Sequence, residues 1–307
     1  MFKLETEQKI FEISGVKFGG QLGQLPMVLV GNLFYKGMPE VRDHKRGEFD
    51  EKSVLKWVEE AEKLSEISGV PHLLDVMAMY PEAMKRYIEF FAEKTEKPLF
   101  IDGANPETRV AAVEKARELG IQERIIFNGI SPTTSTKEIE ALRESHVKAA
   151  VLLALNEVDF SPEGRISVLK GQNNGSGLIE MAERACIEKI LVDTVVFDVP
   201  SIAYAVEAIQ LVKKEFGYPA GCSPANATYD WKAVQKQPLK EGFAAYNVSA
   251  HALAQFFGAN YLIYGPIKQA KNMIPACAMN DAIIAYHAAK KFGVKPLVSN
   301  HPLYKIF

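Results

Sequence analysis

Short apolar runs recur along most of the chain, and each is followed by a longer stretch with apolar residues at helical spacing. Strands that are buried on both faces of a parallel sheet are expected to be almost continuously apolar, as these runs are. Eight alternations of strand and helix therefore predict a single (β/α)8 barrel, the TIM barrel fold. We predict the barrel strands at residues 27–31, 72–76, 98–102, 124–128, 148–155, 189–193, 218–222 and 260–264.

The helical stretches carry recognisable start and stop signals. Asp50 is a favoured N-cap for a helix over residues 51–68, and Gly69 is a favoured residue to end it. Pro106 suits the first turn of a helix over residues 106–119, and a glycine follows that helix. The other helices are predicted at residues 81–95, 136–145, 178–187, 202–216, 249–257 and 279–291.

The segment before the first barrel strand has a two-residue alternation instead. Residues 9–20 alternate apolar and polar positions around a Ser-Gly pair, which predicts a β-hairpin. We expect residues 1–22 to plug the N-terminal end of a barrel that spans residues 27–291, all within one domain. Residues 292–307 then form a C-terminal extension, apolar enough to pack either across a neighbouring subunit or against its own barrel.

Two connections are long, and both follow barrel strands. They span residues 32–49 and 156–177, and the second ends in Gly-Gln-Asn-Asn-Gly-Ser-Gly. Long loops within compact domains are more often lids or binding loops than filler, so we predict that both act as lids. The glycine-rich end of the second loop could also cradle an anion at the next helix, although it lacks the spacing of a phosphate-binding loop.

Composition and charge narrow the classes of partner. The 307 residues are 48% hydrophobic and 24% charged, with a formal net charge of -2, which is ordinary for a soluble globular protein and offers no basic field for nucleic acid. The apolar runs are too short for a membrane span, and the charged N-terminus is unlike a signal peptide. Three cysteines without paired spacing and six histidines without metal-ligand spacing indicate a cytoplasmic protein with no tightly bound metal.

Polar side chains with acid or amide groups end six of the apolar runs. In a (β/α)8 barrel the C-terminal ends of the strands meet the substrate, whereas a single Asp or Asn there is equally well explained as a helix cap. Several together are better explained by binding, and they suit a flat, nitrogen-rich heterocycle. The residues are Asp75, Asp102, Asn128, Asn156, Asp193 and, after a turn, Asn226.

A reduced pterin is one heterocycle that fits these groups. Its aminopyrimidinone edge offers N–H donors at the 2-amino group and N3, and acceptors at O4 and N1. Carboxylates accept from the donors, and carboxamides serve either kind of group. Asp102, Asn128 and Asp193 are the natural groups to hold such a ring, with aliphatic and aromatic neighbours over its faces.

Six sequence blocks in a fixed order carry a resemblance that spans nearly the whole chain. Together they resemble the H subunit family of tetrahydromethanopterin S-methyltransferase, which includes soluble methylcobalamin:tetrahydrofolate methyltransferases of glycine-betaine demethylation. The blocks are Gly-Val-Lys-Phe-Gly-Gly-Gln, Val-Gly-Asn-Leu-Phe-Tyr, Phe-Ile-Asp-Gly-Ala-Asn-Pro-Glu-Thr-Arg, Phe-Asn-Gly-Ile-Ser, Ile-Leu-Val-Asp-Thr and Tyr-Gly-Pro-Ile.

The resemblance implies roles for the strand-end residues. Asp102, Asn128 and Asp193 would bind the pterin ring, and Asn226 would approach N5, the nitrogen that carries the methyl group. Asp75 would lie behind them in a hydrogen-bond network, so that Asn226, Asp193 and Asp75 form the catalytic group. Asn156 would join the pterin-binding set, although the loop after it has no clear counterpart in the shorter relatives.

The activity that the resemblance implies is methyl transfer between a methylcorrinoid and N5 of tetrahydrofolate. The corrinoid, methylcob(III)alamin, would come from a separate corrinoid protein, because the sequence around His44 lacks the Asp-x-His-x-x-Gly spacing of a corrinoid carrier. No side-chain nucleophile is needed, and Cys222 and Ser223 have no recognisable histidine partner. The family also implies a homodimer that works in one-carbon metabolism.

Two other functions stay open from the sequence. The first is a tetrahydromethanopterin-specific subunit that acts only inside a larger methyltransferase complex. The second is a pteroate-forming barrel enzyme, which would need a pyrophosphate pocket rich in Lys and Arg that the strand ends do not offer. We favour tetrahydrofolate as the carrier because residues 223–231 depart from the pattern expected of methanogen members.

Overall fold

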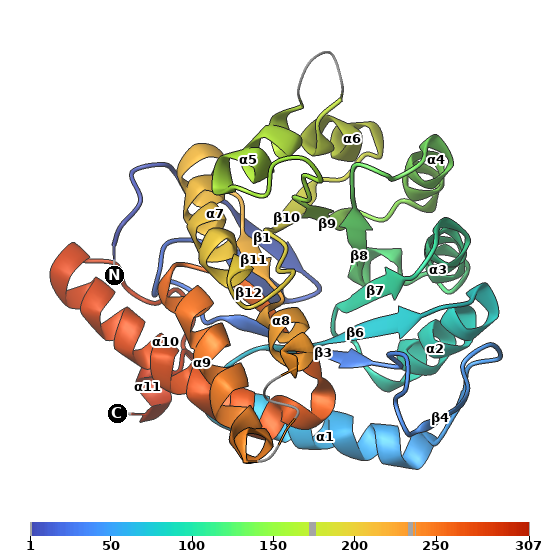
Figure 1. Ribbon diagram of the computed structural model, residues 1–307, viewed down its shortest axis with the longest axis horizontal. Helices are drawn as coiled ribbons and strands as arrows, with labels where there is room; N and C mark the ends of the chain where they lie inside the picture. Colours follow the sequence, from blue (N-terminus) through green and yellow to red (C-terminus); the bar gives the residue numbers. More distant parts are fainter. Residues whose placement is uncertain (1, 172–175, 233–235, 237, 307) are drawn as a thin grey trace.

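Eight parallel strands close into a barrel in the computed structural model, which describes residues 2–171, 176–232, 236 and 238–306 (Figure 1). Strands that follow one another along the chain are neighbours, and β12 pairs with β3 to close the barrel. The predicted (β/α)8 fold is therefore confirmed. The strands are β3 (Val28–Leu33), β6 (His72–Ala78), β7 (Leu99–Gly103), β8 (Ile125–Ile130), β9 (Ala149–Leu153), β10 (Lys189–Asp193), β11 (Ala220–Cys222) and β12 (Tyr261–Pro266).

Helices cover the outside of the barrel, and their ends follow the capping signals. Asp50 accepts a hydrogen bond from the backbone N–H of Ser53 at 3.2 Å, and Gly69 ends α1 in a left-handed conformation with φ of 79°. The predicted helices correspond to α1 (Glu51–Ser68), α2 (Pro81–Lys94), α3 (Pro106–Glu118), α4 (Thr136–Ser145), α6 (Leu178–Arg184), α7 (Ser201–Phe216), α9 (Phe243–Phe256) and α10 (Ala270–Phe292).

Two further helices lie where loops or strand ends were predicted. The connection 156–177, predicted to act as a lid, contains α5 (Pro162–Lys170), while residues 172–175 lie outside the described residues. Ser161 caps α5 by accepting from the N–H of Gly164 at 3.0 Å, and a proline occupies its first turn. The other helix, α8 (Pro224–Asp230), follows β11 directly and likewise begins with a proline.

One predicted boundary needs correction, and one predicted connection contains structure of its own. Helix α10 begins at Ala270, well before the predicted start at residue 279, because its apolar side packs on the barrel despite Pro275 inside it. The connection 32–49 contains a short antiparallel ribbon, β4 (Val41–Asp43) and β5 (Glu48–Phe49). Short 3-10 turns complete the chain: η1 (Gln122–Arg124), η3 (Leu239–Gly242) and η4 (Ile267–Gln269).

The barrel interior is filled from its N-terminal end by the predicted hairpin, β1 (Ile10–Ile13) and β2 (Val16–Gly19). Ile13 and Phe18 are fully buried among the inward-facing side chains of the strands. The ring of Phe18 lies 6.5 Å from that of Phe100 and 6.4 Å from that of Tyr261. We call this cluster the inner core: Ile13, Phe18, Val28, Val30, Leu73, Phe100, Ile126, Ala149, Val151, Leu191, Tyr261 and Ile263.

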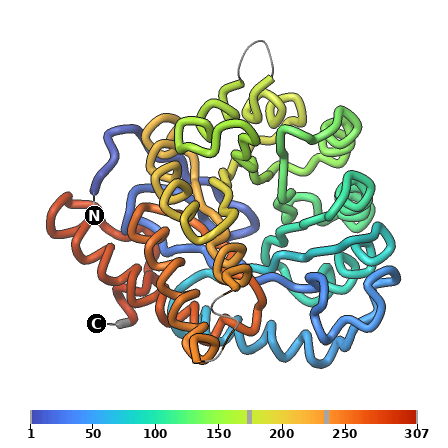
Figure 2. The backbone as a smooth tube through the Cα atoms, in the orientation of Figure 1, coloured from blue at the N-terminus to red at the C-terminus, as the bar shows by residue number. Residues whose placement is uncertain are grey.

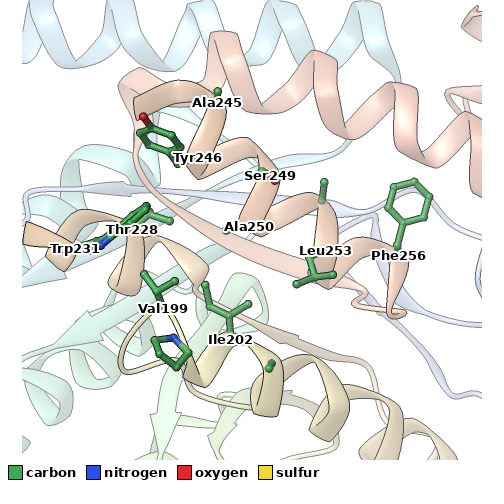
Figure 3. Close-up of a pocket in the computed structure, with 13 residues that line it drawn as sticks. Val199, Ile202, Thr228, Trp231, Ala245, Tyr246, Ser249, Ala250, Leu253 and Phe256 are labelled. Atoms are coloured by element: carbon green, nitrogen blue, oxygen red, sulfur yellow. The ribbon is translucent and has the colours of Figure 1, made fainter. Parts of the chain in front are cut away.

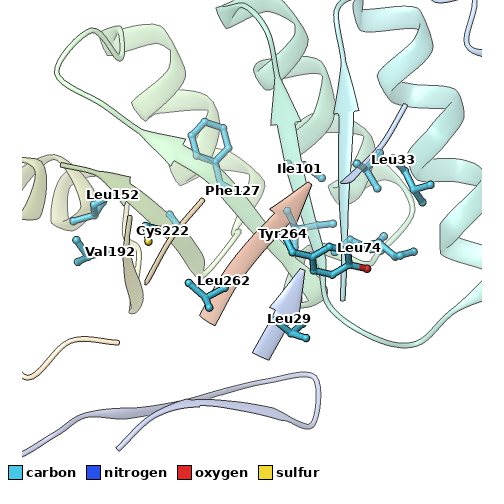
Figure 4. Close-up of a cluster of buried hydrophobic side chains, with 14 of the residues drawn as sticks. Leu29, Leu33, Leu74, Ile101, Phe127, Leu152, Val192, Cys222, Leu262 and Tyr264 are labelled. Atoms are coloured by element: carbon cyan, nitrogen blue, oxygen red, sulfur yellow. The ribbon is translucent and has the colours of Figure 1, made fainter. Parts of the chain in front are cut away.

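A second and larger core lies between the strands and the helices. Its members on the strands alternate with those of the inner core, as the pleat of a strand requires, and Figure 4 shows several of them, including Leu29, Phe127 and Val192. Because both faces of every strand are packed, a polar group has room only where the strands end. The open C-terminal end of the barrel, called the mouth below, is where such groups gather.

The C-terminal extension packs against its own barrel. Helix α11 (Leu303–Ile306) lies beside α1 and α10, and Lys305 donates from Nζ to the backbone oxygen of Glu66 at 2.8 Å. Both chain ends lie on the same side of the molecule (Figure 2). In the described part of the chain, none of the helices combines the length and the apolarity that a membrane span requires.

Candidate active site

The mouth of the barrel collects five inward-facing polar side chains from five strands. In each strand the residue two positions earlier belongs to the inner core, so the alternation of the strand turns the polar residue to the same side. Strand pairing also sets Asn32 on β3 beside Asp75 on β6. The five residues are Asn32, Asp75, Asp102, Asn128 and Asp193.

Asp75 is the deepest of these acids, with only 1% of its surface exposed. Burial raises its pKa well above the usual range, and the nearby charges of Asp102 and Asp193 raise it further. A hydrogen bond from Asn128 acts in the opposite direction. Four of the predicted site residues are therefore within electrostatic reach of one another, and the protonated form of Asp75 is favoured.

Burial also raises the pKa values of the other two acids, Asp102 and Asp193. Burial raises the pKa of Asp102 to about 6, opposed by the charge of Arg109. Burial likewise raises the pKa of Asp193 to about 6, opposed first by the N–H of Val195, which donates to Oδ1 at 2.7 Å, and then by Arg165. Both groups are thus largely ionised at neutral pH and can accept hydrogen bonds from a ligand.

Two buried oxygens in this cluster have no hydrogen-bond partner within the described residues: Oδ1 of Asp75 and Oδ1 of Asn32. The amide nitrogen of Asn32 meets only a weak acceptor, the Met77 sulfur at 3.3 Å. Buried polar atoms are normally satisfied, so two neighbouring oxygens without a partner are consistent with a polar ligand. The sequence interpretation missed Asn32 because the predicted strand stopped one residue short of it.

Asn226 lies beyond the end of its strand, on a short helix. Strand β11 stops at Cys222, and Asn226 lies on α8 with its side chain exposed. Its Oδ1 accepts from the hydroxyl of Ser223 at 3.3 Å, and that hydroxyl also lies 3.1 Å from the backbone oxygen of Ile263. Asn226 thus stands on the short helix that leaves the mouth after β11.

Asn156 is occupied by the loop in which it lies. Its Nδ2 donates to the backbone oxygen of Gly164 at 3.1 Å, and its Oδ1 accepts from the N–H groups of Val158 and Asp159 at 3.0 Å each. These bonds tie the end of β9 to α5. The structure gives Asn156 a loop-closing role and does not bring it into the cluster around Asp75.

The alternative chemistries considered from the sequence gain no support at the mouth. The thiol of Cys222 is fully buried in the larger core between the strands and the helices, and burial raises its pKa well above the usual range, so its thiolate is disfavoured. Within the part of the chain that the structure describes, no three His, Cys, Asp or Glu side chains are grouped so as to hold a metal ion.

One hollow of the structure is lined by none of these polar residues. A groove of about 880 Å³ runs between the start of α7 and α9, with Thr228 and Trp231 from α8 and its end at one side (Figure 3). The side chains that line it are apolar, aromatic or hydroxyl-bearing. Such a surface suits packing rather than acid–base chemistry, so we assign the chemistry to the mouth.

Comparison with known sequences gives matches along the full chain. The family model described as tetrahydromethanopterin S-methyltransferase MtrH subunit matches residues 6–297. The chain is 35% identical over 311 residues to the H subunit of tetrahydromethanopterin S-methyltransferase from Methanothermobacter thermautotrophicus, covering 100% of both chains. It is also 35% identical, over 320 residues and 100% of both chains, to the corresponding H subunit from Methanocaldococcus jannaschii.

Comparison with solved structures returns barrels of the same fold. Xanthomonas albilineans dihydropteroate synthase, in complex with indole-2-carboxylic acid and 6-chloroguanine, superposes with a TM-score of 0.59 at 19% identity over 89% of this chain and 98% of that one. Yersinia pestis dihydropteroate synthase with a pterine-sulfa conjugate gives a TM-score of 0.60 at 13% identity, over 90% and 98%. At such low identity these similarities establish the fold alone.

Proposed function

The chain belongs to the MtrH family, the H subunit family of tetrahydromethanopterin S-methyltransferase, and from that premise we propose that it transfers a methyl group between a methylcorrinoid on a partner protein and N5 of tetrahydrofolate. The family fixes the broader class, a methyltransferase acting on a pterin. The carrier, the corrinoid and the residue roles are our proposal.

The observation that carries the proposal is the cluster of inward-facing acids and amides at the mouth. Asp102 and Asp193 would accept hydrogen bonds from the 2-amino group and N3 of the ring, since both are largely ionised at neutral pH. Asn128 can both donate and accept, which suits O4 and its neighbours. Asp75 would keep the amide of Asn128 oriented from below, through the hydrogen bond between them.

The proposed transfer requires the protein to position the two substrates and to donate one hydrogen bond to N5. When N5 is the nucleophile, it attacks the methyl carbon directly while the electrons of the carbon–metal bond stay with the corrinoid. In the reverse direction N5 is a poor leaving group unless a hydrogen-bond donor reaches it. The exposed amide of Asn226 is the donor we propose. Holding two large substrates in line supplies the rest of the rate enhancement.

The corrinoid would be held by a separate protein that docks over the mouth. His44 lies in the turn between β4 and β5, and the sequence around it lacks the spacing of a corrinoid carrier. We therefore treat methylcobalamin as a substrate delivered by a partner.

A second function is favoured by the names of the relatives, which are subunits of tetrahydromethanopterin S-methyltransferases. In that case the chain would bind tetrahydromethanopterin and turn over only inside a complex. The groups at the mouth suit either carrier because both present the same pterin edge, so the sequence of α8 and its flanks remains our reason to favour tetrahydrofolate.

Turnover by the purified chain separates the two functions. The protein is mixed with free methylcobalamin and either tetrahydrofolate or tetrahydromethanopterin, and cobalamin demethylation is followed by absorbance. We expect turnover with tetrahydrofolate. Binding of tetrahydromethanopterin without turnover would favour the complex-dependent subunit, and binding of neither carrier would contradict both functions.

A further inference from the structure

Arg165 is an almost fully buried cation beside the mouth, with 1% of its surface exposed. It projects from α5, and its guanidinium donates to the backbone oxygens of Phe160 and Val195, the second at 3.2 Å. Phe160 lies before α5 and Val195 lies after β10. Arg165 thus ties together the two loops that flank Asp193.

Val195 has an unusual backbone conformation that these contacts hold in place. Its φ is 56°, in the left-handed region, which is unfavourable for a β-branched residue. The conformation lets its N–H donate to Oδ1 of Asp193 at 2.7 Å while its carbonyl accepts from Arg165. Strain of this kind persists only where surrounding contacts enforce it, and it is frequent at functional sites.

Charge connects the same residues. Asp193 faces charged or titratable groups from four elements: Asp75 on β6, Arg165 on α5, Cys222 on β11 and Tyr261 on β12. Arg165 is the cation in this set, and its charge favours the ionised carboxylate against burial. An arginine keeps its charge when buried, so the effect is constant across the working pH range.

We propose that Arg165 is a positioning residue for the carrier site, which orients the Asp193 carboxylate through the backbone of Val195 and stabilises its ionised form. The inference rests on the proposed binding of a tetrahydropterin. Groups behind a ligand-binding side chain commonly change affinity by about 10- to 100-fold when they are removed. Arg165 acts through Asp193 and contacts no reacting atom.

The test compares Arg165→Met and Arg165→Lys with the wild type by calorimetric titration of tetrahydrofolate between pH 5.5 and 8.5. For Arg165→Met we expect affinity to fall about 10- to 100-fold at pH 6.5 and to recover in part at higher pH. The pH midpoint of binding should move up by about one unit, because the carboxylate loses its cation. Arg165→Lys should keep the midpoint near that of the wild type, with weaker binding because a compact ammonium lacks the two separate nitrogens with which the guanidinium reaches the two carbonyls.

Arg124→Met is the matched control. Arg124 is also buried and donates to a backbone oxygen, that of Lys97 at 3.3 Å, but it lies at the opposite end of the barrel, before β8. This variant should lose stability and keep both the affinity and the midpoint. An equal shift of the midpoint in Arg124→Met, or no shift in a folded Arg165→Met, would overturn the proposal. If Arg165→Met does not fold, wild-type affinity in Arg165→Lys would overturn it.

A second readout separates this inference from the proposed function. Carbon-13 NMR of the Asp193 carboxyl group follows its titration without any carrier. An unchanged Asp193 midpoint in Arg165→Met would reject the positioning role even if the wild type binds tetrahydrofolate. A raised midpoint in a protein that binds neither tetrahydropterin would support the link between Arg165 and Asp193 while the proposed function failed.

Discussion

At the scale of single residues, the burial of an acid at the mouth lowers the free energy of unfolding. Asp193 is buried, and burial lifts its pKa from the ordinary 3.8 to about 6. Between these values the folded protein holds a proton that the unfolded chain has lost. The free energy of unfolding therefore falls as the pH rises through this window, and the loss persists at neutral pH.

Asp193→Asn should accordingly stabilise the protein while it weakens binding. At pH 7.5 we expect the free energy of unfolding to rise by up to about 3 kcal/mol, because a shift of about two pKa units no longer opposes folding. The amide can still accept from Val195. At pH 4 the gain should be much smaller, and tetrahydrofolate affinity at pH 7.5 should fall at least about 10-fold through loss of the charged acceptor. Urea denaturation at both pH values and calorimetry measure these effects.

Asp198→Asn is the control for this prediction. Asp198 lies in the same loop but is exposed, and it accepts from the N–H of Ser201 at the start of α7. This variant should change neither stability nor binding appreciably. Loss of stability at pH 7.5 in Asp193→Asn, together with unchanged affinity, would remove Asp193 from the site.

Asn226 is expected to act in the transfer step rather than in binding. Asn226→Ala removes the donor proposed for N5, so turnover should fall about 10- to 1,000-fold while the dissociation constant of tetrahydrofolate changes less than about 5-fold. Asn226→Asp keeps the shape but not the donor and should behave similarly. Stopped-flow demethylation of methylcobalamin and calorimetry give the two quantities, and a parallel loss of both would make Asn226 a binding residue instead.

The sequence predicted part of the site for a clear physical reason. Asp75, Asp102, Asn128 and Asp193 each follow an apolar run in the sequence, so their place at the mouth follows from the strand pattern. Arg165 could not be found in this way, because its role depends on a bond to Val195, thirty positions away in sequence. Contacts of that kind are made by the tertiary fold and leave no periodic signal.

At the scale of elements, the hairpin is the part that most clearly serves stability. Phe18→Ala would empty a fully buried position in the inner core, and we expect a loss of about 3 to 5 kcal/mol in the free energy of unfolding. Affinity for tetrahydrofolate should stay unchanged, because the hairpin fills the end opposite the mouth. Urea denaturation and calorimetry provide the measurements.

Ile10→Ala controls for the hairpin itself. Ile10 is on the same hairpin, but 39% of its surface is exposed, so its loss should cost much less than that of Phe18. Equal costs for the two variants would show that the hairpin does not pack as a plug. Weakened carrier binding in Phe18→Ala would show that the two ends of the barrel are coupled.

Most elements were predictable because local signals agree with the fold, and the errors have local causes. The N-cap at Ser161 and the following proline mark α5, but the length of the whole connection favoured its interpretation as a lid. Helix α8 was hidden by its position directly after a strand of only three residues, β11. In α10, Pro275 obscured a helix that tertiary packing stabilises.

At the scale of the whole molecule, α9 packs against both α7 and α10 (Figure 1), and all three helices carry exposed apolar side chains. Met279, Ile283 and Tyr286 recur at helical spacing on α10 and are each about half exposed. The groove between α7 and α9 contributes further apolar side chains to the surface of these helices. Exposed apolar side chains on neighbouring helices are common at subunit contacts, and the homodimer expected from the family remains a prediction.

Ile283→Glu should shift the protein from dimer to monomer in sedimentation velocity, because it places a charge within the apolar stripe of α10. Ile67→Glu is the control, since Ile67 is even more exposed but lies on α1. It should leave the dimer intact. A wild-type protein that sediments as a monomer at micromolar concentrations would contradict the prediction.

The central claim, that acids and amides at the mouth hold a pterin ring, is tested most directly by a crystal structure with bound 5-methyltetrahydrofolate. The account predicts the ring among Asp102, Asn128 and Asp193, with its N5 methyl group turned outward toward the open mouth and Asn226. A saturated crystal in which the ligand lies elsewhere, or in which the mouth holds solvent only, would contradict it.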